Sequence, residues 1–113
     1  HFVRAGGALC SRVQATDVVK VATATVSMKA DVTGAVNRYL ATQESLGKAG
    51  AYSIQGQGAD LIETINGDYT TVVGLPLQVS ARLLRSVGYP VPLDVEELYR
   101  RKPYPNWNRF APD

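Results

Sequence analysis

VVKVATATVSM, residues 18–28, is the clearest strand in this sequence, because valine and threonine dominate it. These β-branched residues are stiff at χ1 and pack well on a pleated surface. Residues 2–13 form a second extended segment, and the polar residues 14–17 suit a turn between the two. We therefore expect the two segments to pair as a hairpin, in which Gly6-Gly7 marks a bulge or a close backbone approach.

A helix is expected after the hairpin, since apolar side chains recur at helical spacing from Val32 to Leu40. Side-chain oxygens of Asp31 and Thr33 can cap its first turn. We expect this helix to end near Gln43.

The middle of the chain alternates turn signals with short apolar runs. Residues 46–58 form a glycine-rich loop with room for one helical turn. Residues 59–65 are expected to form a short strand, and Asn66-Gly67 is a strong turn signal. Residues 68–73 are expected to be extended.

The last third of the chain begins with a well-marked helix. Pro76 suits a first helical turn and Gly88 suits a C-terminal cap, so we expect a helix over 76–87. Residues 94–101 predict one or two further helical turns, and residues 102–113 are expected to be irregular. Strands and helices mix without a regular βαβ rhythm, which favours an α/β or α+β fold with a mixed sheet.

Composition limits the classes of function. A length of 113 residues corresponds to about one domain. The net charge of +2 is too small to indicate a nucleic-acid-binding protein. One cysteine and one histidine exclude an intrachain disulfide and a cysteine-based zinc site. No apolar run approaches the roughly 18 residues of a membrane span, and no signal-peptide pattern is present, so we expect a soluble, cytoplasmic protein.

The glycine-rich stretch 47–58 is the first candidate for a site. Glycines let backbone N–H groups approach a phosphate, and Lys48 can add positive charge. The stretch has neither the spacing of a Walker loop nor that of a dinucleotide fingerprint. Gln55 carries donors and an acceptor that can pair with a nucleobase edge. A connecting loop with a solvated glutamine is the simpler interpretation.

The other polar groups give weaker indications. The ten carboxylates form no metal-binding run and supply no convincing general base. The end of the chain interleaves basic and aromatic side chains: Tyr99, Arg100, Arg101, Lys102, Tyr104, Trp107, Arg109 and Phe110. Such a composition can bind single-stranded nucleic acid, but acidic residues balance its charge. We therefore expect these aromatic residues to pack the tail against the body or a second subunit.

Three pieces in order give a more specific indication: GKAGAYSIQG at 47–56, INGDY at 65–69 and VVGLPL at 72–77. Together they resemble the Maf family of house-cleaning nucleoside triphosphate pyrophosphatases. The resemblance covers roughly residues 1–88. Residues 89–113 remain as a tail rich in proline, aromatic and basic residues.

The resemblance implies an α/β fold with a mixed sheet flanked by helices, of which this chain is the C-terminal half. It implies a homodimer, a divalent metal cation (Mg²⁺ or Mn²⁺) and hydrolysis of a nucleoside triphosphate to the monophosphate and pyrophosphate. The KAGAY-IQG form resembles the subfamily that acts on dTTP and UTP. Carried onto this chain, Lys48, Gln55 and Gly56 would bind substrate, with Gln55 selecting the base.

The presumed catalytic base and the main phosphate-binding segment of the family lie upstream of this chain's first residue. The resemblance therefore identifies no catalytic residue here, and we expect the chain to be inactive alone. The alternative is a non-catalytic nucleotide-binding or interaction module. Five positions depart from the family pattern: Ala5 for Thr, Gln43 for Gly, Ser45 for Pro, Ser53 for Gly and Thr71 for Asn.

Overall fold

The computed structural model describes residues 2–11, 16–30 and 33–110. In chain order its elements are β1 (Phe2–Ser11), β2 (Thr16–Met28), α1 (Thr33–Ala41), the 3₁₀ helices η1 (Ala49–Ala51) and η2 (Gln57–Leu61), β3 (Ile62–Asn66), α2 (Tyr69–Val73), α3 (Leu77–Ser86), α4 (Val95–Arg101) and α5 (Trp107–Phe110). This mixture of sheet and helices confirms the predicted α/β class. No helix within the described ranges is long and apolar enough to cross a membrane.

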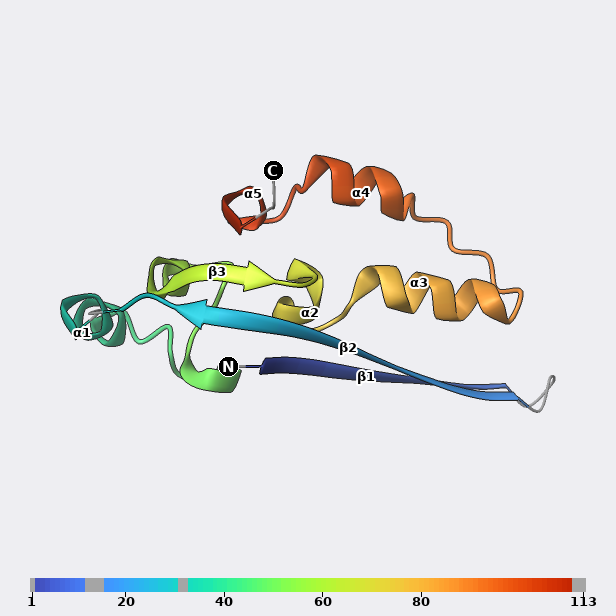
Figure 1. Cartoon of the computed structure of the whole chain (residues 1–113), viewed down its shortest axis with the longest axis horizontal. Helices are drawn as coiled ribbons and strands as arrows, with labels where there is room; N and C mark the ends of the chain where they lie inside the picture. Colours follow the sequence, from blue (N-terminus) through green and yellow to red (C-terminus); the bar gives the residue numbers. More distant parts are fainter. Residues whose placement is uncertain (1, 12–15, 31–32, 111–113) are drawn as a thin grey trace.

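Among the described residues, the three strands form one antiparallel sheet in the order β1-β2-β3 (Figure 1). The predicted hairpin is confirmed by a continuous ladder between β1 and β2. That ladder runs without a shift through Gly6-Gly7, so no bulge lies there. The register shifts instead between Ser27 and Met28, where β2 pairs with β3. Thr16 and Asp17, which were predicted to belong to the turn, lie in β2 instead, and residues 14–15 of the predicted turn lie outside the described part of the chain.

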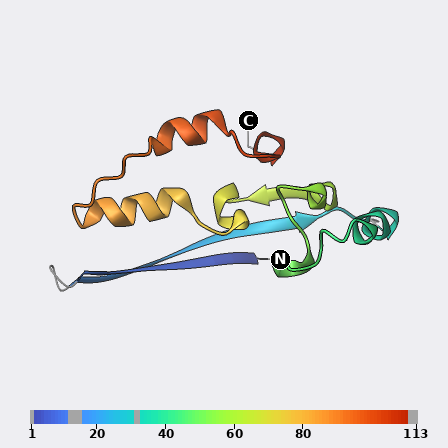
Figure 2. The same cartoon turned by 180° about the vertical axis from the view of Figure 1, so that it is seen from behind.

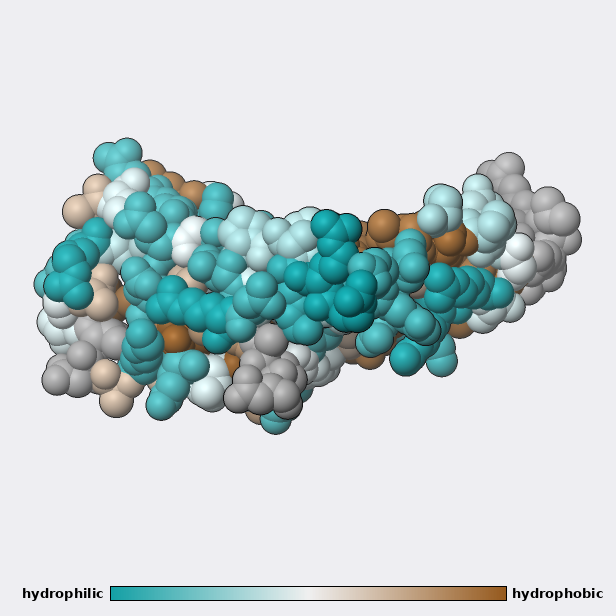
Figure 3. Space-filling model, turned by 90° about the horizontal axis from the view of Figure 1, so that it is seen from above, coloured by the Kyte–Doolittle hydropathy of each residue, from teal (hydrophilic) through white to brown (hydrophobic). Residues whose placement is uncertain are grey.

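The molecule is long and narrow, measuring 54 × 27 × 20 Å. The β1–β2 hairpin runs along most of its length, with α2 and α3 beside it and α4 and α5 forming the layer beyond them (Figures 1 and 2). Helix α1 lies at the end of the molecule opposite to the end of β1 and the start of β2 (Figure 1). The face seen from the α4 side is mostly hydrophilic, and apolar atoms gather toward the end of the molecule where β1 ends and β2 begins (Figure 3).

The hydrophobic core lies where β2, β3, α2 and α5 meet. Its buried members are Val26, Ile54, Ile62, Tyr69 and Trp107. The ring of Trp107 stacks on Tyr69 with centroids 5.0 Å apart, and Tyr99 meets Trp107 edge-on at 5.1 Å. The prediction that aromatic residues of the tail pack against the body is confirmed by these contacts.

Residues 59–61 belong to the helix η2, so the strand predicted from residue 59 is wrong in its first half. The backbone N–H groups of Gln57 and Gly58 donate to the Glu44 carboxylate at 3.2 and 3.3 Å. These bonds satisfy N–H groups that the first turn of a helix leaves without a partner. A cap supplied from 13 residues away leaves no mark on the local apolar pattern.

Residues 69–73 form the helix α2, so the extended segment predicted there is wrong. The Asp68 carboxylate accepts a hydrogen bond from the backbone N–H of Thr70 at 2.8 Å and caps the helix. Tyr69, Thr70 and Thr71 are all buried. Capping and burial together outweigh the preference of the β-branched residues for strands.

Gly67 lies at the turn where the chain changes direction between β3 and α2. Its φ of 128° lies in a region that L side chains rarely adopt. A Cβ at this position would also lie 2.9 Å from the Cα of Ala24. The predicted Asn66-Gly67 turn therefore joins a strand to a helix, with β2 packed closely against it.

The remaining expectations concern helices. Those predicted to end near Gln43, over 76–87 and over 94–101 correspond to α1, α3 and α4, and η1 is the helical turn expected in the glycine-rich loop. The cap predicted at Asp31 lies outside the described residues. The tail is not irregular throughout, because α5 forms one turn within residues 102–113 around a buried tryptophan.

Gln43 provides a test of backbone strain. It replaces a glycine of the family pattern and adopts a φ of 61°, in the left-handed region that costs an L residue roughly 1–2 kcal/mol. Because a glycine also loses more freedom on folding, we expect Gln43→Gly to raise the free energy of unfolding by about 0.5–1 kcal/mol. Urea denaturation measures this change. The same substitution at Gln78, exposed in α3, should destabilise the chain by about 0.5 kcal/mol, and destabilisation by both substitutions would refute the strain at Gln43.

Candidate functional site

A cavity of about 530 Å³ lies between the start of β1, the glycine-rich loop and α2. Its volume falls within the range of small-molecule sites. Of the three residues predicted to bind substrate, Lys48 and Gln55 line this cavity. Gly56 is not among its described lining residues. Their role in substrate binding stays a prediction.

The charges around the cavity suit an anion. Arg4 from β1 and Lys48 from the loop both line it, and no carboxylate is among the described lining residues. Two cations beside an anionic ligand lower its electrostatic energy, most of all where water is partly excluded. Sequence analysis missed Arg4, because a lone arginine on a strand carries no motif.

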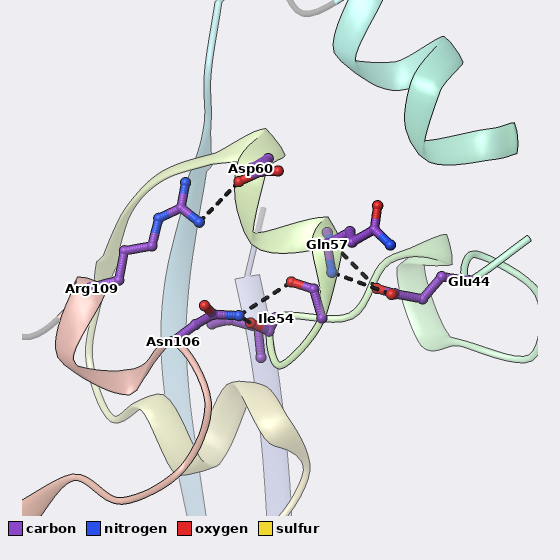
Figure 4. Close-up of polar contacts among 8 residues, drawn as sticks. Glu44, Ile54, Gln57, Asp60, Asn106 and Arg109 are labelled. Atoms are coloured by element: carbon purple, nitrogen blue, oxygen red, sulfur yellow. Dashed lines mark hydrogen bonds and ion pairs between the residues drawn. The ribbon is translucent and has the colours of Figure 1, made fainter. Parts of the chain in front are cut away.

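The loop that carries Gln55 is held on one side by Tyr39 and Glu44. The Tyr39 hydroxyl donates to Oε1 of Glu44 at 2.9 Å and accepts from the backbone N–H of Ser53 at 2.9 Å. Glu44 also accepts from the N–H groups that begin η2, as the contact with Gln57 in Figure 4 shows. One tyrosine and one carboxylate thus anchor the loop both before and after Gln55.

Gly56 has a packing role in this arrangement. A Cβ at residue 56 would overlap the carboxylate of Glu44. Any side chain there would displace Glu44 from the N–H groups of η2. The glycine therefore keeps the loop close to its anchor, whatever part residue 56 has in contacting a ligand.

The pKa values of this pair follow from their contacts. Burial raises the pKa of Tyr39, and its hydrogen bond to Glu44 raises it further. Burial alone would raise the pKa of Glu44. The N–H groups of Gln57 and Gly58, the Tyr39 hydroxyl and the charge of Lys48 outweigh burial and hold that pKa below its ordinary value of 4.5.

The other side of the loop is held by α5 and the residue before it. Nδ2 of Asn106 donates to the carbonyl oxygens of Ile54 and Gly56, and Arg109 pairs with Asp60 at 2.9 Å (Figure 4). Sequence analysis missed Asn106, because an asparagine in a proline-rich segment is unremarkable. Glu44 anchors the opposite side of the loop. The one indication of this role in the sequence is its position between the end of a helix and the glycine-rich loop.

The residues described here do not fit a divalent cation at this cavity. Mg²⁺ and similar ions prefer carboxylate and other oxygen ligands. The described lining of the cavity holds no carboxylate. Across the described residues, no three His, Cys, Asp or Glu side chains gather closely enough to hold a metal ion.

Comparison with known sequences identifies the family. Residues 1–87 match the sequence profile of the Maf family, described as Maf-like protein. The dTTP/UTP pyrophosphatase of Dictyoglomus thermophilum is 44% identical over 89 residues, which cover 79% of this chain and 46% of that protein. The dTTP/UTP pyrophosphatase of Methylobacillus flagellatus is 44% identical over 92 residues, which cover 81% of this chain and 45% of that protein. The dTTP/UTP pyrophosphatase of Aromatoleum aromaticum is 54% identical over 56 residues, which cover 50% of this chain and 27% of that protein.

This chain belongs to the Maf family, as the resemblance in the sequence predicted. It spans about half the length of the curated relatives from Dictyoglomus thermophilum and Methylobacillus flagellatus. The matched region ends at residue 87, so the C-terminal segment with Asn106 lies outside it.

The lowered pKa of Glu44 predicts a pH dependence of stability. Because the carboxylate binds a proton less readily in the folded chain than in the unfolded one, its stabilising effect is complete above pH 4.5. The effect is lost as the pH falls through the lowered pKa. We expect Glu44→Gln to lower the melting temperature at pH 7, and the difference from wild type to shrink toward pH 3.

Circular dichroism between pH 7 and pH 3 measures this difference. Glu63→Gln, at an exposed position of β3, controls for the loss of one negative charge. A constant difference between wild type and Glu44→Gln across the range would contradict the role assigned to the carboxylate.

Proposed function

We propose that this chain carries the base-recognition part of a nucleoside triphosphate pyrophosphatase acting on dTTP and UTP. The observation that carries the proposal is that Lys48 and Gln55 of the glycine-rich loop line one cavity together with Arg4, which comes from the first strand. The names of the relatives from Dictyoglomus thermophilum and Methylobacillus flagellatus agree with this substrate class. The reaction would cleave the bond between the α-phosphorus and the α–β bridging oxygen with water, giving the monophosphate and pyrophosphate.

Gln55 supports the choice of base. An amide offers N–H donors and a carbonyl acceptor on one planar group. A uracil-type edge presents an N–H donor beside carbonyl acceptors, so one amide can satisfy both kinds of group. A site that uses such a pair rejects bases whose groups would remain unpaired.

Lys48 and Arg4 support the binding of the phosphates. Their positive charges would neutralise part of the triphosphate, and Arg4 can offer two parallel N–H groups to phosphate oxygens. Neither residue can act as a general base while protonated. The divalent cation that the family resemblance implies would need ligands outside the described lining of this cavity. A homodimer and a cytoplasmic location belong to the same proposal.

A non-catalytic nucleotide-binding module is the second candidate. The absence of a carboxylate from the described lining of the cavity favours it, because a carboxylate or histidine is the usual group that activates water and the described lining has neither. Fusing the chain to the unmatched part of the Dictyoglomus thermophilum relative separates the two candidates. Pyrophosphate release by the fusion supports the enzyme, and nucleotide binding without release supports the module.

Nucleotide binding by the chain tests the cavity directly. Calorimetric titrations with and without Mg²⁺ measure the affinities. We expect Lys48→Ala to weaken the binding of UTP, dTTP and CTP alike, because it removes a phosphate contact. Gln55→Glu removes the N–H donors of the side chain and should lower the affinity for UTP and dTTP by about tenfold. Gln57→Glu, the same change at an exposed neighbour, is the matched control. If Gln55→Glu and Gln57→Glu lowered the nucleotide affinities equally, contact between Gln55 and the base would be excluded.

We also expect the isolated 113-residue chain to release no pyrophosphate from dTTP at a useful rate. The reason is that the described lining of the cavity offers no carboxylate or histidine to activate water. A coupled phosphate assay with added inorganic pyrophosphatase measures the rate. Release of pyrophosphate that Gln55→Glu abolishes would overturn this prediction.

A further inference from the structure

The turn that carries Gln55 is held from its second side by the C-terminal strap, as we call residues 104–110. Nδ2 of Asn106 donates to the carbonyl oxygen of Ile54 at 2.8 Å and to that of Gly56 at 3.2 Å (Figure 4). These two carbonyls belong to the residues immediately before and after Gln55. A single amide group therefore fixes the backbone on both sides of it.

The position of Asn106 is set by its neighbours in the core. Trp107 is 4% exposed and stacks on Tyr69 with the rings 7° from parallel. The carbonyl oxygen of Pro105 accepts a hydrogen bond from the Tyr69 hydroxyl at 2.5 Å. Asn106 itself has a φ of 68°, a conformation that asparagine tolerates better than most residues.

The ion pair at the end of the strap contributes less. Arg109 and Asp60 lie 2.9 Å apart, but their side chains are 43% and 67% exposed. An exposed pair of this kind adds little to stability. The half-buried amide of Asn106, with two carbonyl partners, is the contact through which the strap acts on the turn.

The side chain of Gln55 lies beside Tyr69. Its interaction with the hydroxyl lowers the pKa of Tyr69 against the larger effect of burial, which raises that pKa. The same hydroxyl donates to the carbonyl oxygen of Pro105 in the strap. Because Asn106 holds the carbonyls on both sides of Gln55, the side chain of Gln55 leaves the backbone from a fixed position, which restricts the orientations of its amide.

Orientation matters because of the chemistry of the pyrimidines. Uracil presents an acceptor at O4 and a donor at N3, whereas cytosine presents a donor at N4 and an acceptor at N3; the acceptor O2 is common to both. An amide that flips freely can pair with either base, whereas an amide held in one orientation prefers one of them. Selection of uracil over cytosine by a glutamine therefore requires a second group that fixes the amide.

We propose that Asn106 is a positioning residue that holds Gln55 in the orientation that selects uracil-type bases over cytosine. The inference rests on the proposed function, since it assigns the source of selectivity at the same cavity. Asn106 lies beyond residue 87, where the match to the family profile ends.

The test compares three variants of the full 113-residue chain. Asn106→Asp keeps the shape and the tolerance of positive φ, but it turns carboxylate oxygens toward two carbonyl oxygens. Asn106→Gly keeps the backbone conformation and removes the amide. Asn108→Asp makes the same charge change at an exposed position of α5. The readouts are the affinities for UTP and CTP and the hydrogen exchange of the Gly56 and Gly58 amides.

We expect both changes at Asn106 to lower the ratio of UTP to CTP affinity by about three- to tenfold and to speed exchange at the turn. Asn108→Asp should change neither. A general loss of stability would lower the affinities for UTP and CTP alike. The ratio of the two affinities therefore distinguishes an effect on the position of Gln55 from an effect on folding. Fluorescence of the single tryptophan, Trp107, reports whether the core of each variant is intact.

An unchanged ratio in both Asn106 variants, with native tryptophan fluorescence, would overturn the inference. Equal affinity of the wild-type chain for UTP and CTP would instead overturn the proposed function. Amide exchange at Gly56 and Gly58 would then decide by itself whether Asn106 holds the turn.

Discussion

The carboxylate of Glu44 is the group on which the arrangement of the candidate site depends. Residues 53–58 form no strand pairing that would satisfy their backbone N–H groups, and an unpaired buried N–H is costly. Glu44 accepts from two of these groups and from Tyr39, which accepts from a third. The loop therefore has a defined shape, and η2 begins where the carboxylate caps it.

The C-terminal strap completes this arrangement from the opposite side. Its aromatic packing against Tyr69 buries a large apolar surface, which is the main source of stability in a core. The hydrogen bonds of Asn106 contribute less to stability but determine which backbone atoms of the loop face the strap. The loop that carries Gln55 thus lies between a carboxylate from the matched region and an amide from outside it.

The candidate site was only partly predictable. Lys48 and Gln55 could be named from the sequence because they share one short motif, and both line the cavity. Arg4 could not, because only folding brings the first strand beside the loop. Asn106 lies 52 residues from Ile54, its partner in the loop, and no pattern in the proline-rich tail indicates that contact.

The sequence by itself determined the elements whose signals are local. β-branched residues specify the strand β2, and Pro76 with Gly88 bounds α3, because steric preferences of single residues act on their immediate neighbours. Only the tertiary structure decided that residues 59–61 and 69–73 are helical and that Asn106 meets the loop. In each of these cases burial or a distant hydrogen bond outweighs local propensity, which amounts to at most about 1 kcal/mol per residue.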